Sequence, residues 1–265
     1  MSAPATLWLL AAPLSRFTAG GPGAGAEARG AAHGGAAFGT DPRRSVSPAG
    51  ERGAPGPAER ERAAAFTSPA ARERFLAGRA LLRAAGSAAL GVPAARLRVV
   101  SFCPRCGEGG HGAPTLVDAA TGAALAAASL SRAAGWGLAA VAPAGWRVGV
   151  DLVDPEDPAF KAGGPGYVAP AEAWARGEAV GKARGEGLVP VGLPDAAAGA
   201  GADPGAAGRP APGGTRGAGR ARAVPDAVVH RVPGTRLLCA LSAAPPPEGE
   251  APRVKWLSDP AFRTH

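Results

Sequence analysis

The stretch that decides the fold lies in the second half of the chain. It begins with RVGVDLVDPEDPAF at residues 147–160 and continues, after a glycine-rich spacer, with YVAPAEAWARGEAVGKARGEGL at residues 167–188. The first part alternates between valine or leucine and small or acidic residues. This pattern predicts a strand over 147–153 with Asp151 on the face opposite to Val148, Val150 and Leu152. The second part predicts a helix over 170–183.

The predicted helix carries an acid and a lysine one turn apart. Because a helix repeats every 3.6 residues, Trp174, Glu178 and Lys182 lie on one face. An isolated Glu–Lys pair at this spacing is ordinarily a surface ion pair, which contributes ~0.3–0.5 kcal/mol. With Asp151 facing it, the same pair has the groups needed to hold a divalent metal against a phosphate. Gly149 would let a ligand approach Asp151 closely. Both interpretations stay open on this stretch alone.

The composition divides the chain into ordered and low-complexity parts. The length of 265 residues suggests one or two domains, and glycine (41) and proline (28) make up about a quarter of them. This excess is concentrated at about 18–56 and 193–220, which we expect to be disordered insertions. The net charge of +8 comes almost entirely from arginine. An arginine-rich surface favours anionic partners such as phosphates, nucleic acid or acidic proteins, although a merely solvated surface has the same composition.

The sequence favours a soluble, cytoplasmic protein that does not bind membranes. No apolar run approaches the ~18 residues of a membrane span. The run LWLL at residues 7–10 is short and has no basic residue before it, which argues against a signal peptide. Three cysteines do not form a disulfide framework.

Other elements follow from turn and capping signals. We expect strands over 6–14, 95–102, 227–233 and 235–244, two short strands within 114–128, and a hairpin of 136–142 with 147–153. Helices are expected from Pro57 and, with Ser68 as the N-cap, from Pro69 to about 89. On the second helix Arg72, Arg79 and Arg83 form one cationic stripe, which is either a solvated face or a phosphate-binding edge.

One motif has the spacing of metal ligands. Cys103, Cys106 and His111 reproduce the first three ligands of a CCHC zinc knuckle, but Leu116 stands where the fourth ligand belongs. Cys239 would have to return by folding to replace it. An unmetallated turn is the simpler interpretation. The alternative is an arginine-rich, zinc-knuckle-like protein that binds nucleic acid, against which the lack of clustered aromatic residues counts.

The order of the motifs carries a family resemblance. The chain contains, in this order, FLAGRALLR (75–83), HGAP (111–114), SLSR (129–132), GVDLV (149–153) and WARGEAVGKARGEGL (174–188). This series resembles the large, pseudo-dimeric type of 4′-phosphopantetheinyl transferase. The resemblance covers residues 57–244 apart from the insertion after 193, and 6–14 corresponds to the first strand of the family.

The resemblance implies a fold and an activity. The fold would be α+β, with two pseudo-symmetric halves, 1–142 and 143–265, each a small antiparallel sheet packed with a helix. The active site would lie between the halves. The enzyme would transfer 4′-phosphopantetheine from coenzyme A to a serine of an apo acyl or peptidyl carrier protein, with Mg²⁺ as cofactor. The resemblance also leads us to expect a monomer. Its expected partners are coenzyme A and the apo carrier protein, and not nucleic acid.

The resemblance also implies roles for particular residues. Asp151 and Glu178 would hold Mg²⁺ on the pyrophosphate of coenzyme A, and Lys182 would contact a phosphate. Glu178, directly or through a water, would take the proton of the attacking serine, so Glu178 and Lys182 are the expected catalytic residues. The residues expected to bind coenzyme A around its 3′-phosphate and base are Arg79, His111, Gly112, Pro114, Ser131 and Arg132.

Three positions depart from the family pattern. Val153 stands where this type has a second metal-binding glutamate, although residues 149–154 are similar to the G-x-D-x-V-E pattern of the smaller trimeric carrier-protein synthases. Gly177 replaces a lysine, and Arg132 replaces a histidine but keeps a positive charge for a phosphate. These departures leave open a degenerate homologue that binds coenzyme A without turnover.

Overall fold

The computed structural model describes residues 5–18, 53–103, 107, 109–161, 171–185, 227–245 and 252–257. Its helices are α1 (Pro57–Ala64), α2 (Pro69–Leu90), α3 (Pro158–Lys161) and α4 (Ala171–Arg184), with 3-10 turns η1 (Leu14–Phe17) and η3 (Ala94–Arg96). Its strands are β1 (Thr6–Pro13), β2 (Leu97–Phe102), β3 (Ala113–Asp118), β4 (Ala124–Ala133), β5 (Trp136–Pro143), β6 (Arg147–Val153), β7 (Val228–Arg231), β8 (Leu238–Ala244) and β9 (Arg253–Trp256). The insertions expected at about 18–56 and 193–220 fall almost wholly outside the described residues.

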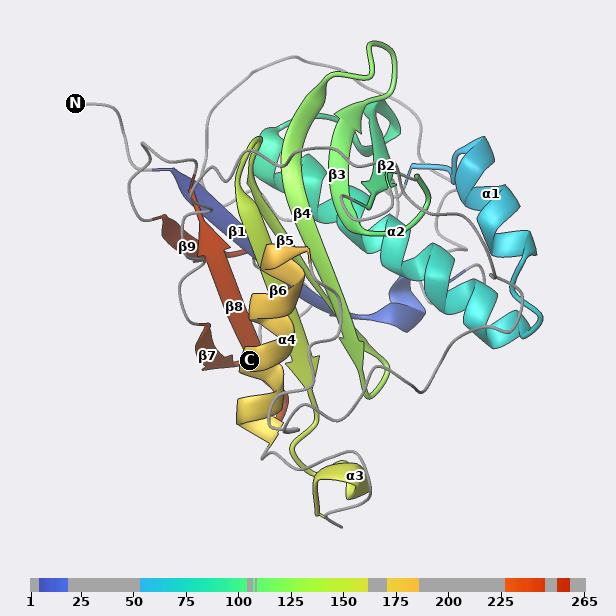
Figure 1. The fold of residues 1–265 in the computed structure, drawn as a ribbon. Helices are drawn as coiled ribbons and strands as arrows, with labels where there is room; N and C mark the ends of the chain where they lie inside the picture. Colours follow the sequence, from blue (N-terminus) through green and yellow to red (C-terminus); the bar gives the residue numbers. More distant parts are fainter. Residues whose placement is uncertain are drawn as a thin grey trace, which may run out of the picture.

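Two sheets organise the fold (Figure 1). The larger sheet has the strand order β2-β3-β4-β5-β1-β9 and is antiparallel except between β1 and β9. The smaller sheet has the order β6-β8-β7 and is antiparallel. With its helices this makes a mixed α+β fold, as the sequence predicts. No helix in the described ranges is long and apolar enough to cross a membrane.

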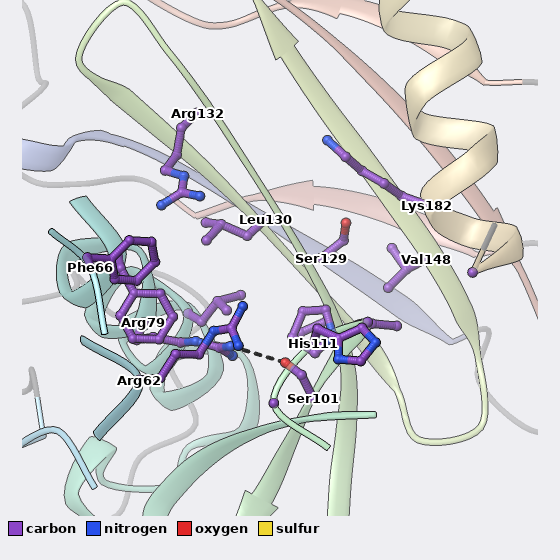
Figure 2. A pocket seen from close by; sticks show the side chains of 18 residues that line it. Arg62, Phe66, Arg79, Ser101, His111, Ser129, Leu130, Arg132, Val148 and Lys182 are labelled. Carbon is purple, nitrogen blue, oxygen red and sulfur yellow. Dashed lines mark hydrogen bonds between the residues drawn. The ribbon is translucent and has the colours of Figure 1, made fainter. Parts of the chain in front are cut away.

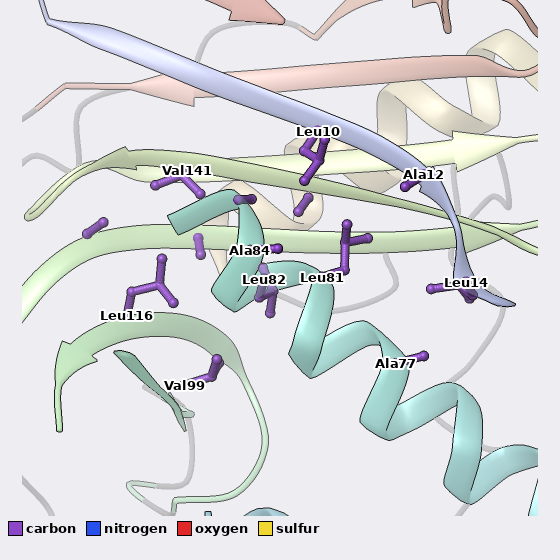
Figure 3. Packing of buried hydrophobic residues seen from close by; sticks show 14 residues of the cluster. Leu10, Ala12, Leu14, Ala77, Leu81, Leu82, Ala84, Val99, Leu116 and Val141 are labelled. Carbon is purple, nitrogen blue, oxygen red and sulfur yellow. The ribbon is translucent and has the colours of Figure 1, made fainter. Parts of the chain in front are cut away.

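Three apolar cores among the described residues arrange these elements in four layers. The first core lies between α2 and the larger sheet, where Leu81 and Leu82 pack with Leu10 and Val141 (Figure 3). The second core lies between the two sheets, and the third, made largely of alanines, lies between the smaller sheet and α4. Figure 1 accordingly shows α2 and α4 on opposite sides of the sheets.

The predicted hairpin of 136–142 with 147–153 is wrong, although both strands exist. β5 belongs to the larger sheet, whereas β6 pairs with β8 in the smaller one. The chain passes from one sheet to the other in a tight turn, in which the Trp146 amide donates to the Pro143 carbonyl at 3.2 Å. The reason is that β5 is buried on both faces: Leu138 points to the core between the sheets, and Ala139 to the core under α2.

The expected division into halves 1–142 and 143–265 is not confirmed. β9 comes from the end of the described chain but pairs in parallel with β1, with Thr6 opposite Arg253 and Leu9 opposite Trp256. The larger sheet therefore combines strands from both predicted halves. β9 was not expected from the sequence, and Trp256 at its end packs against the core between the sheets.

β6 has the expected alternation. Val148 and Val150 face the core between the sheets, whereas Gly149 and Asp151 face α4. A Cβ added at Gly149 would lie 2.0 Å from the backbone oxygen of Ala179 in α4. The glycine thus lets a helix approach the strand, and not a ligand as the sequence suggested.

The ends of α2 follow the capping signals in the sequence. The Ser68 hydroxyl accepts a hydrogen bond from the Ala71 amide at 3.4 Å, and Pro69 occupies the first turn. The helix ends at Leu90, where Gly91 adopts a left-handed conformation with φ of 67°. These local signals fix the position of the helix that lines one side of the site.

The arginine stripe on α2 is not a solvated face. Arg83 is only 2% exposed, and its guanidinium binds the Glu59 carboxylate of α1 at 2.7 Å. Arg72 donates from Nε to the Ala63 carbonyl of α1 at 3.1 Å. Two of the three arginines therefore connect α2 to α1 by a hydrogen bond and an ion pair, and the third, Arg79, lines the cavity described below.

Candidate functional site

A cavity of about 410 Å³ opens between α2, the larger sheet and the end of α4. Of the residues that the sequence predicts around coenzyme A, the cavity is lined by Arg79, His111, Gly112, Pro114 and Arg132. Lys182, the predicted phosphate contact, reaches the same cavity from α4 (Figure 2). The structure therefore brings together side chains that lie more than 100 positions apart in the sequence.

Cationic groups approach the cavity from different sides. Arg79 donates from NH2 to the Ser101 hydroxyl at 3.1 Å, and Arg132 donates from NH1 to the Arg74 carbonyl at 3.1 Å. Burial lowers the pKa of both guanidinium groups, but arginine starts so high that both stay charged at neutral pH. Together with Lys182 they give the cavity a positive field suited to a phosphate-bearing ligand.

The HGAP segment forms one wall of the cavity and leads into β3. Gly112 has a φ of 92°, and a Cβ at this position would lie 2.3 Å from the backbone oxygen of Phe102. Only glycine fits both the conformation and the space. The exposed His111 and the adjoining Pro114 are held beside the cavity by this turn.

Behind the cavity, Asp151 accepts two hydrogen bonds at one carboxylate oxygen. The Ser131 hydroxyl donates to Asp151 Oδ1 at 2.8 Å, and Lys182 Nζ donates to the same oxygen at 2.6 Å. Lys182 Nζ also donates to the Val150 carbonyl at 3.1 Å. Ser131 is not among the residues that line the cavity, so its contact in this structure is with the carboxylate. The sequence identified Ser131 but not this partner.

Glu178 is buried next to this group, and one of its oxygens has no partner among the described residues. Glu178 is 6% exposed, and Oε1 makes no hydrogen bond to the part of the chain that the structure describes. Burial raises the pKa of the Glu178 carboxyl, and the charge of Asp151 raises it further, while Lys182 acts in the opposite direction. A surface ion pair of Glu178 with Lys182 is one of the two interpretations of this spacing; in the structure Lys182 Nζ lies 2.6 Å from Asp151 Oδ1.

The neighbouring acidic and aliphatic positions do not add a third carboxylate. Val153 packs in the core between the smaller sheet and α4. Asp154, next in the chain, accepts from Arg236 NH2 at 2.6 Å. Within the described ranges no three His, Cys, Asp or Glu side chains gather in one place. Among the described residues, Asp151 and Glu178 are therefore the carboxylates that we consider for a cation.

Three cavity residues escaped the sequence analysis. Arg62 of α1, Phe66 and Phe75 line the same cavity, and the two phenylalanine rings lie 5.4 Å apart between centroids. The guanidinium of Arg79 lies over the Phe75 ring at 5.2 Å from its centroid. Phe75 stands in the FLAGRALLR motif, but Arg62 on α1 and Phe66 in the connection between α1 and α2 carry no distinguishing signal in the sequence.

The zinc-knuckle motif is only partly within the described residues, because Cys106 lies outside them. Leu116 is fully buried in the core under α2. Cys239 is fully buried between the two sheets, where desolvation raises the pKa of its thiol to about 11. Cys239 therefore does not return to the motif as a fourth ligand.

The arrangement joins an anion-binding cavity to a pair of buried carboxylates. Lys182 belongs to both, since it lines the cavity and binds Asp151. Such a site can bind a polyanion together with a divalent cation. The sequence matches no protein-family model and shows no significant similarity to a curated protein.

Proposed function

We propose that the protein transfers 4′-phosphopantetheine from coenzyme A to a serine of an apo acyl or peptidyl carrier protein, with Mg²⁺ as cofactor. The observation that supports this most strongly is the place of Lys182. Its side chain connects the cavity lined by Arg79 and Arg132 to the carboxylates of Asp151 and Glu178. A pyrophosphate with its cation needs this combination of positive and negative groups.

The two carboxylates fit a magnesium ion. Mg²⁺ prefers oxygen ligands and keeps several of its waters, so two protein carboxylates suffice. Glu178 Oε1 is a buried oxygen that has no hydrogen-bond partner within the described ranges, which is costly unless something else binds it. The negative charges of Asp151 and Glu178 also disfavour each other, and a divalent cation between them would remove this repulsion. When bound, the ion would neutralise charge on the pyrophosphate.

The cavity would receive the 3′-phosphate and adenosine of coenzyme A. Its volume of about 410 Å³ lies in the range of small-molecule sites. Arg79 and Arg132 would bind the 3′-phosphate, the latter in place of the family histidine, while His111, Gly112 and Pro114 would border the adenosine. Phe66 and Phe75 offer apolar surface to the same ligand.

The reaction follows from these positions. The carrier serine oxygen attacks the β-phosphorus of coenzyme A, a new P–O bond forms, and the bond to 3′,5′-ADP breaks. Glu178 would accept the serine proton, directly or through a water, and its raised pKa makes it a better base than an exposed glutamate. Lys182 would stabilise the charge that develops on the leaving phosphate.

We infer further that the site lies between two related halves, one covered by α2 and the other by α4, in a monomeric, cytoplasmic enzyme. A degenerate homologue is the second candidate. It is favoured by Val153, which places a buried aliphatic side chain where the family has a metal-binding acid. It is also favoured by Gly177, which has no cationic side chain where the family has a lysine.

The test is an incubation with coenzyme A, Mg²⁺ and several apo carrier domains, followed by mass spectrometry of the carriers. Covalent addition of phosphopantetheine to the carrier serine is the expected result. If coenzyme A raises the melting temperature of the protein but no carrier is modified, the protein binds coenzyme A without turnover. If neither effect occurs, the proposal is wrong.

A further inference from the structure

Lys182 already occupies the carboxylate that a metal ion would need. Its ammonium lies 2.6 Å from Asp151 Oδ1 and is fixed by a second hydrogen bond to the Val150 carbonyl. The Asp151 side chain is 8% exposed, so the pair is largely shielded from water. Ser131 holds the same oxygen from the other side. In this arrangement Asp151 has an internal counter-ion, whereas Glu178 Oε1 has no hydrogen-bond partner among the residues that the structure describes.

We propose that Lys182 is an exchangeable internal cation, which neutralises Asp151 until a divalent cation and the pyrophosphate of coenzyme A arrive together, and which then moves to the pyrophosphate. The inference rests on the proposed function for the identity of the anion. The Lys182 ammonium and a divalent cation compete for Asp151, because both bind the same carboxylate oxygens. When the divalent cation displaces the ammonium, Lys182 loses its partner Asp151, and this loss is offset only if the ammonium binds another anion.

The geometry favours Lys182 as the group that moves. Its side chain is 28% exposed and lines the cavity, so a rotation about its flexible stem carries the ammonium from Asp151 towards a ligand. Asp151 cannot follow, since β6 is paired along its whole length with β8. Cation loading and coenzyme A binding are therefore expected to be coupled, and each should strengthen the other by the same factor.

The chain allows this movement to be observed directly, because it contains only three lysines, Lys161, Lys182 and Lys255. In ¹⁵N-lysine-labelled protein the side-chain Nζ signals can be assigned with Lys182→Arg. Without ligands, the Lys182 signal should show slow hydrogen exchange, and Asp151→Asn should remove this protection. Addition of Mg²⁺ with coenzyme A should shift the Lys182 signal and leave the other two in place.

A binding experiment tests the competition separately. Mn²⁺ replaces Mg²⁺ as a probe, and its binding is measured by electron paramagnetic resonance without any carrier. Lys182→Gln should bind Mn²⁺ about tenfold more tightly than the wild type in the absence of coenzyme A, since a charge-assisted hydrogen bond no longer competes. Coenzyme A should then strengthen Mn²⁺ binding less than in the wild type. Arg98→Gln removes the same charge from an exposed position on β2 and should leave both values unchanged.

The outcomes separate this inference from the proposed function. A Lys182 signal that stays in place while Mg²⁺ and coenzyme A bind, or equal Mn²⁺ affinity of Lys182→Gln and wild type, overturns the exchange, even if carriers are modified. A Lys182 signal that moves with Mg²⁺ and coenzyme A, in a protein that modifies no carrier, leaves the exchange standing and contradicts the transferase activity.

Discussion

Gly149→Ala tests how the site is assembled. The added methyl group would lie 2.0 Å from the Ala179 oxygen and 2.5 Å from the Ala183 nitrogen, both backbone atoms of α4 that cannot rotate away. Since ordinary van der Waals contacts begin near 3.4 Å, the distance to the Ala179 oxygen has to grow by about 1.4 Å, and α4 has to retreat from β6. Overpacking of this kind costs ~1–3 kcal/mol, and the backbone contacts place this variant at the upper end. The retreat also pulls Lys182 away from Asp151.

Urea unfolding and carrier modification together measure this effect. We expect the free energy of unfolding to fall by about 3 kcal/mol. Where the variant remains folded, the transfer rate should fall by about 100-fold, because a displacement of ~1 Å in a catalytic group is enough. Gly56→Ala is the matched control, because among the described residues no atom beyond its chain neighbours lies within 4 Å of the added Cβ. A Gly149→Ala variant with the stability and activity of Gly56→Ala would refute the close packing of β6 on α4.

Three further outcomes follow from buried groups. Arg83→Met should lower the free energy of unfolding by about 3–5 kcal/mol, because it leaves the buried Glu59 carboxylate without its counter-ion, and the added change Glu59→Leu should restore part of the loss. Cys239 should resist thiol reagents in the native protein at neutral pH, since its pKa is about 11, and rapid labelling of the Cys239 peptide in mass spectrometry would contradict its position. In metal-free protein the raised pKa of Glu178 means that the folded state binds a proton more tightly, so stability should fall as the pH rises from the normal glutamate pKa through the raised one. Glu178→Gln should lose this part of the pH dependence in urea titrations, and an unchanged profile would exclude Glu178 as its source.

Local signals in the sequence predicted local structure well. Ser68, Pro69 and the glycine after Leu90 mark the ends of α2 because caps act on backbone groups within one turn. The alternation in 147–153 correctly separated Asp151 from Val148 and Val150, since strand geometry alone fixes which side chains share a face.

Long-range pairing was beyond the same signals. The runs that form β5 and β6 are apolar along most of their length, and a strand buried on both faces shows no preference for a hairpin over a second sheet. β9 is a strand of four residues that pairs with β1, and its short sequence contains no pattern that predicts this pairing.

The candidate site shows the same division. The motif order identified the residues that gather at the cavity, but not the contacts that give some of them a different task. Ser131 turns to Asp151, Gly149 makes room for α4, and Arg83 binds Glu59, because each partner comes from a distant part of the chain. Residue type and spacing do not reveal such partners, because these contacts form only when the helices and sheets pack against each other.

Mass spectrometry of an apo carrier domain, incubated with coenzyme A, Mg²⁺ and either the wild type or Asp151→Ala, tests the central claim most directly. We expect phosphopantetheine on the carrier serine with the wild type, and none with Asp151→Ala or after removal of Mg²⁺ with a chelator. A carrier that stays unmodified with the wild type in the presence of coenzyme A and Mg²⁺ would contradict the proposed transferase activity. Equal modification by the wild type and Asp151→Ala would contradict the role of Asp151.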